Sequence, residues 1–206
     1  MTGVESTANT GTGPADTPAG RHPAAPPGLA QIQAFVNTAD LEAGEDELAS
    51  VSALAAWLQE HGLAREDAAF GPDDLLRARA VREALRDLLG GNAGHPVKLA
   101  SLAVLDGAAA AAPLAVRFKA DGRPALRPAG QGLSAALGAL LADIATAAAD
   151  GTWVRLKTCL NDRCRWAYWD GSKNRSGAWC SMAICGNRMK GRRYRSRRRH
   201  EGSAVP

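Results

Sequence analysis

The sequence predicts an α+β protein that is mostly helical. It has a helical N-terminal domain with one β-hairpin, followed by a small four-cysteine module with a basic C-terminal helix. Three observations support this prediction. Apolar residues recur at steps of three and four through most of residues 28–150, one segment near 114–128 alternates with a period of two, and all four cysteines lie between residues 159 and 185.

The two ends of the chain are expected to lie outside the folded parts. Residues 1–27 are mostly Thr, Gly, Pro and Ala and contain no Phe, Trp or Tyr, so they cannot bury enough apolar surface to offset the entropy of ordering. We therefore expect a disordered tail over 1–27, a helical domain over 28–150, the four-cysteine module with its basic helix over 151–199, and a tail over 200–206.

Five helices are predicted in the larger domain, because each segment places its apolar residues on one stripe. The segments are 29–40, 51–62, 72–91, the shorter 98–106 and 132–151. The residues expected to face the core are Leu29, Ile32, Phe35, Val36, Val51, Leu54, Ala55, Leu58, Ala78, Val81, Leu85, Leu88, Leu133, Leu137, Leu140, Leu141 and Ile144. Gly62 suits a helix C-cap, Pro72 marks the start of the third helix, and Gly90 and Gly91 are expected to end it.

The hairpin is predicted where the period changes. Leu114, Val116 and Phe118 alternate with smaller or charged residues, 120–122 ("ADG") is a turn signal, and 124–128 is the return strand. The prolines of the return strand place it at a sheet edge.

Candidate chemistry in the larger domain is sparse. His61 and His95 are isolated, and His61 suits a partner for a helix C-terminus. Asn37 and Thr38 end an apolar run, either as a local cap or as a polar anchor in a small ligand pocket. No nucleophile and base stand out together, so the sequence predicts that the protein is not an enzyme.

The cysteines form two matched pairs, Cys159-x4-Cys164 and Cys180-x4-Cys185, joined by 15 residues. Thiolates are good ligands for tetrahedral zinc, and two such pairs can close around one ion. We predict one structural Zn²⁺, because four protein ligands leave no open position for water or substrate. Buried free thiols or a redox pair are the alternatives, and four thiolates could also take iron.

Large rings surround these ligands in sequence, at Trp153, Trp166, Tyr168, Trp169 and Trp179. We expect the metal and the rings to form the core of the module, which should unfold without zinc. Ser181 is expected to cap a helix that turns Met182, Cys185 and Met189 toward the metal.

Charge is distributed unevenly along a chain of net charge +4. From Gly151 onward there are 14 Lys/Arg and 3 Asp/Glu, a net of +11, whereas residues 1–150 carry 11 and 18, a net of −7. The basic residues after the last cysteine are Arg188, Lys190, Arg192, Arg193, Arg195, Arg197, Arg198 and Arg199. If about six of these charges neutralised phosphates of a nucleic acid, a log–log plot of binding affinity against salt concentration would have a slope of roughly −5. The alternatives are a frayed solubilising tail and an acidic half that folds back to mask the basic half.

The motifs resemble a known family. "WCSMAICGNRMKGRRYRSR", with "CLNDRC" and "WDGSKNRSGAWC" before it, resembles the CGNR zinc finger, named for Cys185-Gly186-Asn187-Arg188. "AFVNT", "LAAWLQEHGL" and "RARAVREALRDLL" resemble the ABATE domain that accompanies it, so the resemblance covers roughly 28–199. It implies that the four cysteines hold zinc, that the CGNR and following basic residues contact DNA, and that the protein is a bacterial stress-induced transcription regulator.

Together these features predict a zinc-dependent, DNA-binding transcription regulator. Asn174, Arg175, Asn187 and Arg188 are the candidates for specific or orienting contacts with double-stranded DNA, unless Asp170 ties Arg175 or Arg188 into the scaffold. The helical domain is expected to sense a small-molecule effector or to hold a homodimer. An RNA- or ribosome-associated zinc-binding protein is the alternative, since both polymers present phosphates. An enzyme in the helical domain is a third hypothesis. The sequence shows no signal peptide and predicts no membrane span, so we expect a cytoplasmic, nucleoid-associated protein.

Overall fold

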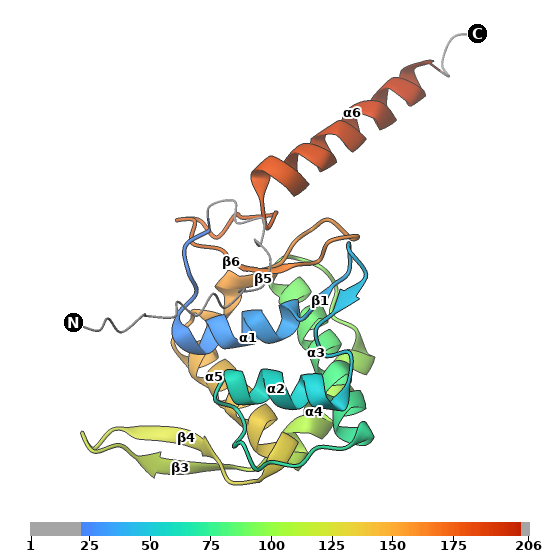
Figure 1. Ribbon diagram of the computed structural model, residues 1–206. Helices are drawn as coiled ribbons and strands as arrows, with labels where there is room; N and C mark the ends of the chain where they lie inside the picture. Colours follow the sequence, from blue (N-terminus) through green and yellow to red (C-terminus); the bar gives the residue numbers. More distant parts are fainter. Residues whose placement is uncertain (1–21, 203–206) are drawn as a thin grey trace, which may run out of the picture.

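The chain forms a helical body with a β-hairpin projecting from one end and a long helix from the other (Figure 1). The computed structural model describes residues 22–202, except for the side chains of residues 197 and 199–202. The predicted tails therefore fall mostly outside the described residues.

The described part of the chain is mostly helical, with three small antiparallel hairpins. Its helices are α1 (Pro27–Asn37), α2 (Val51–Glu60), α3 (Pro72–Asn92), α4 (Leu99–Ala111), α5 (Gly132–Ala149) and α6 (Asn187–Gly202), with a short 3-10 helix η1 (Trp153–Arg155) and a π-helix η2 (Met182–Gly186). The paired strands are β1 (Ala39–Asp40) with β2 (Glu45–Asp46), β3 (Leu114–Phe118) with β4 (Pro124–Pro128), and β5 (Leu156–Thr158) with β6 (Ala167–Trp169). The predicted α+β fold class is confirmed.

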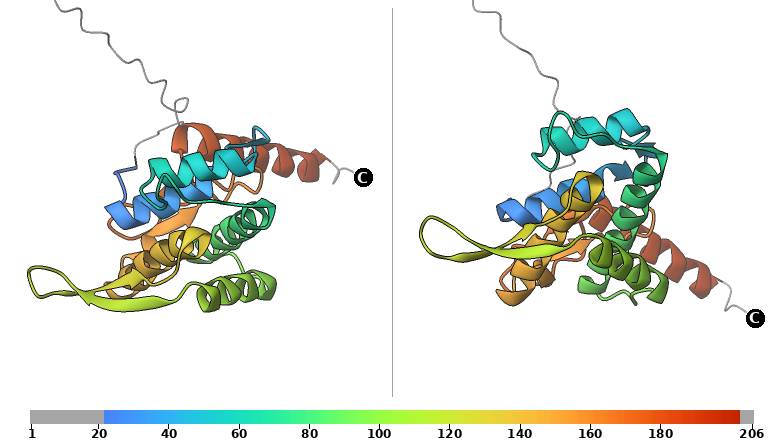
Figure 2. Two further views of the ribbon diagram at one scale, coloured as in Figure 1. Left: turned by 60° about the horizontal axis from the view of Figure 1, so that its bottom comes forward. Right: turned by 90° about the horizontal axis from the view of Figure 1, so that it is seen from below.

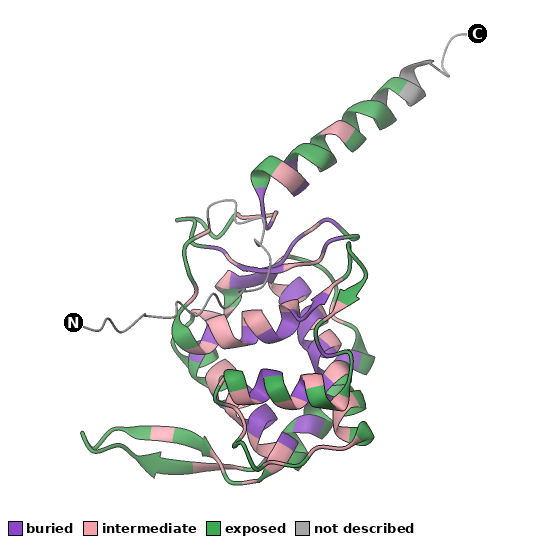
Figure 3. Cartoon of the chain, in the orientation of Figure 1, coloured by how far each residue is buried: buried purple, intermediate pink, exposed green. Residues whose placement is uncertain are grey.

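The body is held by the apolar stripes of α1, α2, α3 and α5, which meet in one core (Figure 3). Ile32 and Phe35 of α1, Leu85 of α3 and Leu137 of α5 are almost fully enclosed. Each such side chain contributes about 1.5–3 kcal/mol by leaving water. Some predicted core positions are only half-buried, namely Val51, Ala55, Leu88, Leu141 and Ile144.

The four-cysteine module shares this core. Leu156 of β5 and Ala167 of β6 are fully buried in it, and Trp153 and Trp169 pack against it. β5 contacts α3, and β6 contacts α1. The module is therefore packed against the helical body rather than joined to it by a free linker.

Three helix boundaries differ from prediction. α1 ends at Asn37 rather than at Asp40, because Ala39 and Asp40 form strand β1 and pair with β2. α3 continues through Gly90 and Gly91. Gly91 serves close packing rather than helix termination, because a Cβ there would lie 2.6 Å from Val97 Cγ2. The chain turns instead at Gly94, whose φ is +96°. α4 extends to Ala111, beyond the predicted 98–106.

α5 is the one helix in the described part of the chain that is long and apolar enough to cross a membrane by length and composition. Its leucines Leu133, Leu137 and Leu140 are buried in the protein core. Core packing therefore accounts for its composition.

The hairpin of β3 and β4 matches its prediction closely. Its register pairs Leu114 with Pro128 and Phe118 with Pro124, and its turn contains Gly122 at φ +79°. Since this sheet has two strands, both are edge strands, where proline is tolerated.

Candidate metal centre and nucleic-acid interface

The four cysteines meet at one buried point. Their sulfur atoms all lie within 4.8 Å of one another, with Cys164 and Cys180 3.6 Å apart and Cys180 and Cys185 3.8 Å apart. Four sulfurs placed about 2.3 Å from a zinc ion at tetrahedral angles are about 3.8 Å apart. The cluster thus has the size and ligand set of one structural zinc site.

The first cysteine pair is positioned by the hairpin of β5 and β6. Cys159 donates its backbone N–H to Trp166 O at 2.9 Å, and Cys164 donates to Asn161 O at 2.8 Å. Arg165 closes the turn at φ +46°. The buried Asn161 also directs its amide toward Cys185 Sγ, at 3.6 Å, where a donor stabilises a thiolate.

The second pair brackets the start of a helix. Cys180 precedes Ser181, whose hydroxyl accepts from Ile184 N at 3.3 Å, which confirms the predicted cap. Cys185 lies in the π-helix that follows. This longer turn shifts the helical phase, so Met182 is exposed rather than facing the metal, and Ile184 packs against the cysteines instead.

The charge of the cluster explains its need for a cation. Hydrogen bonding to Cys159 and Cys164, together with burial, raises the pKa of Cys180. Hydrogen bonding to Cys159 and burial raise the pKa of Cys164 to about 12, against the opposing effect of its bond with Cys180. Four thiolates this close are stable only beside a divalent cation, as in a structural zinc site.

The rings divide between two cores. Tyr168 is buried against the cysteines, with Trp166 and Trp179 half-buried beside it. Trp153 and Trp169 pack against the core of the helical body instead. Three of the five rings thus lie at the cysteine cluster, as expected for a core made of the metal and a few large rings.

A buried ion pair shapes the loop between the two cysteine pairs. Asp170, fully buried, accepts from Lys157 Nζ at 2.7 Å and from Gly177 N at 2.8 Å. Burial alone would raise the pKa of Asp170, but these bonds and those from Ser172 hold it well below its usual range. Gly177 is required here, because a Cβ would lie 2.8 Å from the Asp170 carboxyl carbon.

This arrangement corrects the role considered for Asp170. Its partner is Lys157, not the side chain of Arg175 or Arg188. Lys157 Nζ also donates to the carbonyl of Arg175, whose φ is +53°. Asn174 and Arg175 are thereby exposed on a fixed loop.

α6 leaves the zinc module with its basic side chains exposed. Exposed positions with described side chains are Arg188, Lys190, Arg192, Arg193, Arg195 and Arg198, together with Asn187. The side chains of Arg197 and Arg199, also predicted as contacts, lie outside the described part. Asn187 Nδ2 donates to Ala183 O at 3.0 Å, one helical turn back.

A cavity of about 370 Å³ lies where α6 meets the module and the body. Arg188, Arg192 and Arg195 line it from α6, joined by Arg163 of the first cysteine turn. Glu42, from the turn between β1 and β2, pairs with Arg188. The sequence analysis missed both Arg163 and Glu42.

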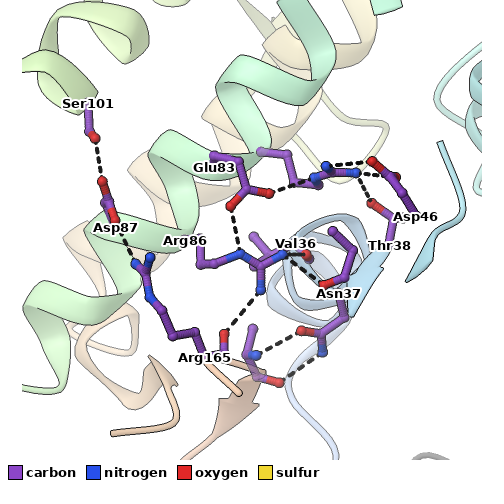
Figure 4. A network of polar contacts seen from close by, with 12 residues as sticks. Val36, Asn37, Thr38, Asp46, Glu83, Arg86, Asp87, Ser101 and Arg165 are labelled. Atoms are coloured by element: carbon purple, nitrogen blue, oxygen red, sulfur yellow. Dashed lines mark hydrogen bonds and ion pairs between the residues drawn. The ribbon is translucent and has the colours of Figure 1, made fainter. Parts of the chain in front are cut away.

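A polar network joins the module to the body (Figure 4). Asn37 at the end of α1 donates to Ala167 O at 2.9 Å and accepts from Ala167 N at 2.7 Å, across 130 residues of sequence. Its role is thus neither local cap nor ligand anchor. Thr38 does cap locally, since its hydroxyl donates to Phe35 O at 2.8 Å.

Two arginines of α3 complete the network. Arg86 is fully buried and donates to the carbonyls of Val36, Ala39 and Arg165, as well as to Glu83. One turn earlier, Arg82 forms two bonds with Asp46 at 2.6 and 2.9 Å.

Asp87 ties the module to the body from the other side of α3. It accepts from Arg165 of the module at 2.6 Å and from Ser101 of α4 at 2.6 Å. Burial would raise the pKa of Asp87, but hydrogen bonds from Ser101, Arg165 and Lys98 outweigh it and lower the pKa to about 2.

The fold and the site define a zinc-finger protein whose finger is fixed to a helical domain and carries a basic helix. Residues 29–151 match the ABATE model, described as "Putative stress-induced transcription regulator", and residues 155–198 match the CGNR zinc finger. No curated protein matches the chain. The chain belongs to the ABATE family, with a CGNR zinc finger behind the family domain. Neither matched family is one of enzymes.

Proposed function

We propose that the protein is a DNA-binding transcription regulator in which zinc orients α6 for insertion into DNA. One observation carries the proposal: α6 stands clear of the body with its described arginines exposed (Figure 1). Its 16 residues span about 24 Å, and a helix fits the major groove of B-DNA. On this proposal the protein is not an enzyme and acts in the cytoplasm, at the nucleoid.

The spacing of the arginines suggests how α6 would lie on DNA. Arg188, Arg192 and Arg195, at steps of four and three, line the same cavity as Arg163. This side of α6 would bind the phosphate backbone of one DNA strand, since a guanidinium group can donate two hydrogen bonds to one phosphate. Lys190 and Arg193 lie on the opposite side of the helix and would reach bases or the other strand.

The orienting contacts are proposed at the start of α6. Asn187 and Lys190 line a second cavity, of about 610 Å³, together with the loop residues Ser176 and Gly177. Asn174 and Arg175 are exposed in the same loop, which the pair of Lys157 and Asp170 fixes. These side chains would set the position of the module on DNA.

The helical domain would hold the DNA-binding module in position and would contain the binding site of an effector. A cavity of about 830 Å³ lies between the loop after α2 and the start of α5, with Arg65, Arg77 and Gln131 in its wall. A small molecule bound there should change the affinity for DNA. Metabolite additions that leave this affinity unchanged would count against a sensing role.

The RNA alternative depends on rings that could stack on unpaired bases. Trp166 packs against the cysteines and Trp169 against the main core. Neither is a free platform, so no observation here favours RNA over DNA.

The test is selection of bound duplexes from a random DNA pool, with zinc-loaded full-length protein at physiological salt. We expect an enriched motif, and a shallower salt slope, by roughly one per lost phosphate contact, in Arg192→Gln and Arg195→Gln. Lys98→Gln, which removes an exposed positive charge just before α4 and outside the proposed effector cavity, is the control and should bind as wild type. Binding that follows salt alone, without an enriched motif, would refute sequence-specific regulation.

A further inference from the structure

Exposed apolar side chains are concentrated in one short segment of the chain. Eleven large hydrophobic residues are exposed in the described part, and six of them fall between α4 and β4. They are Leu99, Leu102, Val104, Val116, Phe118 and Leu126. Clustered exposure of this kind marks an interaction surface, whereas single exposed residues need no explanation.

α4 is apolar on every side although most of it faces solvent. Asp106 is its one charged residue, and only Ser101, Leu105 and Ala108 are buried against the body. A helix that is apolar all round is normally enclosed. Leu99, at the start of α4, is 82% exposed, so nothing in the described chain covers the outer side.

The hairpin that follows α4 is amphipathic. Cross-strand pairing places Val116 with Leu126, and Phe118 with Pro124, on one side of the hairpin. Arg117, between Val116 and Phe118 in sequence, lies on the other side. Phe118 is 75% exposed and Val116 58% exposed. The hairpin extends away from the body as an arm, at the end where α4 lies and opposite α6 (Figures 1 and 2).

Charge indicates what the arm binds. Residues 114–128 carry Arg117, Lys119, Arg123 and Arg127 against Asp121, a net of +3. The remainder of 28–150 carries 6 Lys/Arg and 15 Asp/Glu, a net of −9. The arm therefore complements the helical body in charge, yet it projects away from its own body. A second copy of the chain supplies the same acidic surface and the same exposed α4.

We propose that two copies form a symmetric dimer through this surface, with the arm of each copy lying over α4 of the other. The apolar sides of arm and helix would be enclosed together. The arm's basic residues, on its other side, would lie at the rim of this contact, close enough to be attracted by the acidic body of the second copy. Such a two-fold contact uses one patch twice and closes on itself. Both α6 helices stay free, at the two far ends of the dimer.

This inference goes beyond the proposed function, because it gives the helical domain the additional role of a dimerisation module. The test uses no DNA, so a failure to bind DNA and a failure to dimerise are separate results. The molar mass of zinc-loaded full-length protein is measured by light scattering during size exclusion over a range of concentrations. We expect twice 21.4 kDa, which is 42.8 kDa.

Three variants make the test specific. Phe118→Glu on the arm and Leu99→Glu on α4 place a charge in the proposed contact, and each should give the monomer mass at concentrations where the wild type is dimeric. Leu76→Glu is the matched control, because Leu76 on α3 is similarly exposed, at 63%, and lies outside this surface. Circular dichroism and zinc content must match the wild type in all three.

Two outcomes would overturn the proposal. One is a wild-type mass of 21.4 kDa at every concentration. The other is a dimer that survives both Phe118→Glu and Leu99→Glu.

Discussion

Asn37 provides a direct test of whether the helical body holds the zinc module in place. Its amide makes two hydrogen bonds with the backbone of Ala167, at 2.7 and 2.9 Å, and Ala167 is fully buried. Asn37→Ala removes both partners at once. The N–H and C=O of Ala167 would then be enclosed without a partner unless water enters.

The expected cost follows from these two groups. A buried polar group that loses its partner costs about 1–3 kcal/mol, so two groups give an upper limit of about 6 kcal/mol. Asn37 is itself only half-buried, so water can reach part of the vacated space. We therefore expect a loss of about 2–4 kcal/mol, a large fraction of the stability of a typical domain.

Urea unfolding followed by tryptophan fluorescence measures this loss, since the module contains Trp166, Trp169 and Trp179. Chelator competition should also show faster zinc release, because the hairpin that carries the first cysteine pair loses its support. Gln59→Ala is the control: Gln59 donates to exposed carbonyls, and its loss should cost under about 0.5 kcal/mol. An equally small effect for Asn37→Ala would show that this contact does not hold the module.

Four further predictions concern the metal, acid stability, the loop and the basic helix. Zinc removal by a chelator should unfold the module and destabilise the body that shares its core, and an unchanged circular dichroism spectrum in fully metal-free protein would contradict this. The pKa of Asp87 is lowered from 3.8 to about 2, so its ionised form adds about 2 kcal/mol to the free energy of unfolding. This contribution is complete above about pH 4 and is lost as the pH falls toward about 2. In urea unfolding, Asp87→Asn should therefore lose less stability than the wild type over that pH range. Gly177→Ala should cost about 1–3 kcal/mol in urea unfolding because its Cβ meets the Asp170 carboxylate, whereas Gly107→Ala on open α4 surface should be neutral or stabilising. Glu42→Gln should raise DNA affinity up to about fivefold in fluorescence anisotropy, because it releases the exposed Arg188. Glu45→Gln removes an exposed acid at the start of β2 that has no ion-pair partner among the described residues, and it should change the affinity less.

Local patterns in the sequence were sufficient to predict the helices of the body, the projecting hairpin and the cysteine cluster. Each depends on spacing within a short segment: Leu29, Ile32 and Phe35 on one helix side, or two cysteine pairs with equal gaps. The polar network could not be predicted in the same way. Asn37 reaches Ala167 across 130 residues, and no local pattern specifies that partner.

One signal for the network was nevertheless present. Arg82 and Arg86 each follow a core residue of α3, Val81 and Leu85, and so fall beside its buried stripe. A charged side chain at such a position must find several partners, because an unpaired buried charge is costly. The phase of η2 had no comparable signal: a single π turn moves Met182 to the surface without changing the sequence pattern.

The contacts between body and module fix the position of the zinc module, from which α6 starts. Asn37 and Arg86 hold the β5–β6 hairpin, Asp87 holds Arg165 beside Cys164, and Glu42 holds Arg188 at the start of the helix. Three of these four body residues lie on α1 or α3. A ligand that moved either helix would therefore displace the zinc module and α6 with it. On the proposed function, DNA binding could therefore be regulated without a flexible linker, because a small movement within the body would redirect the basic helix.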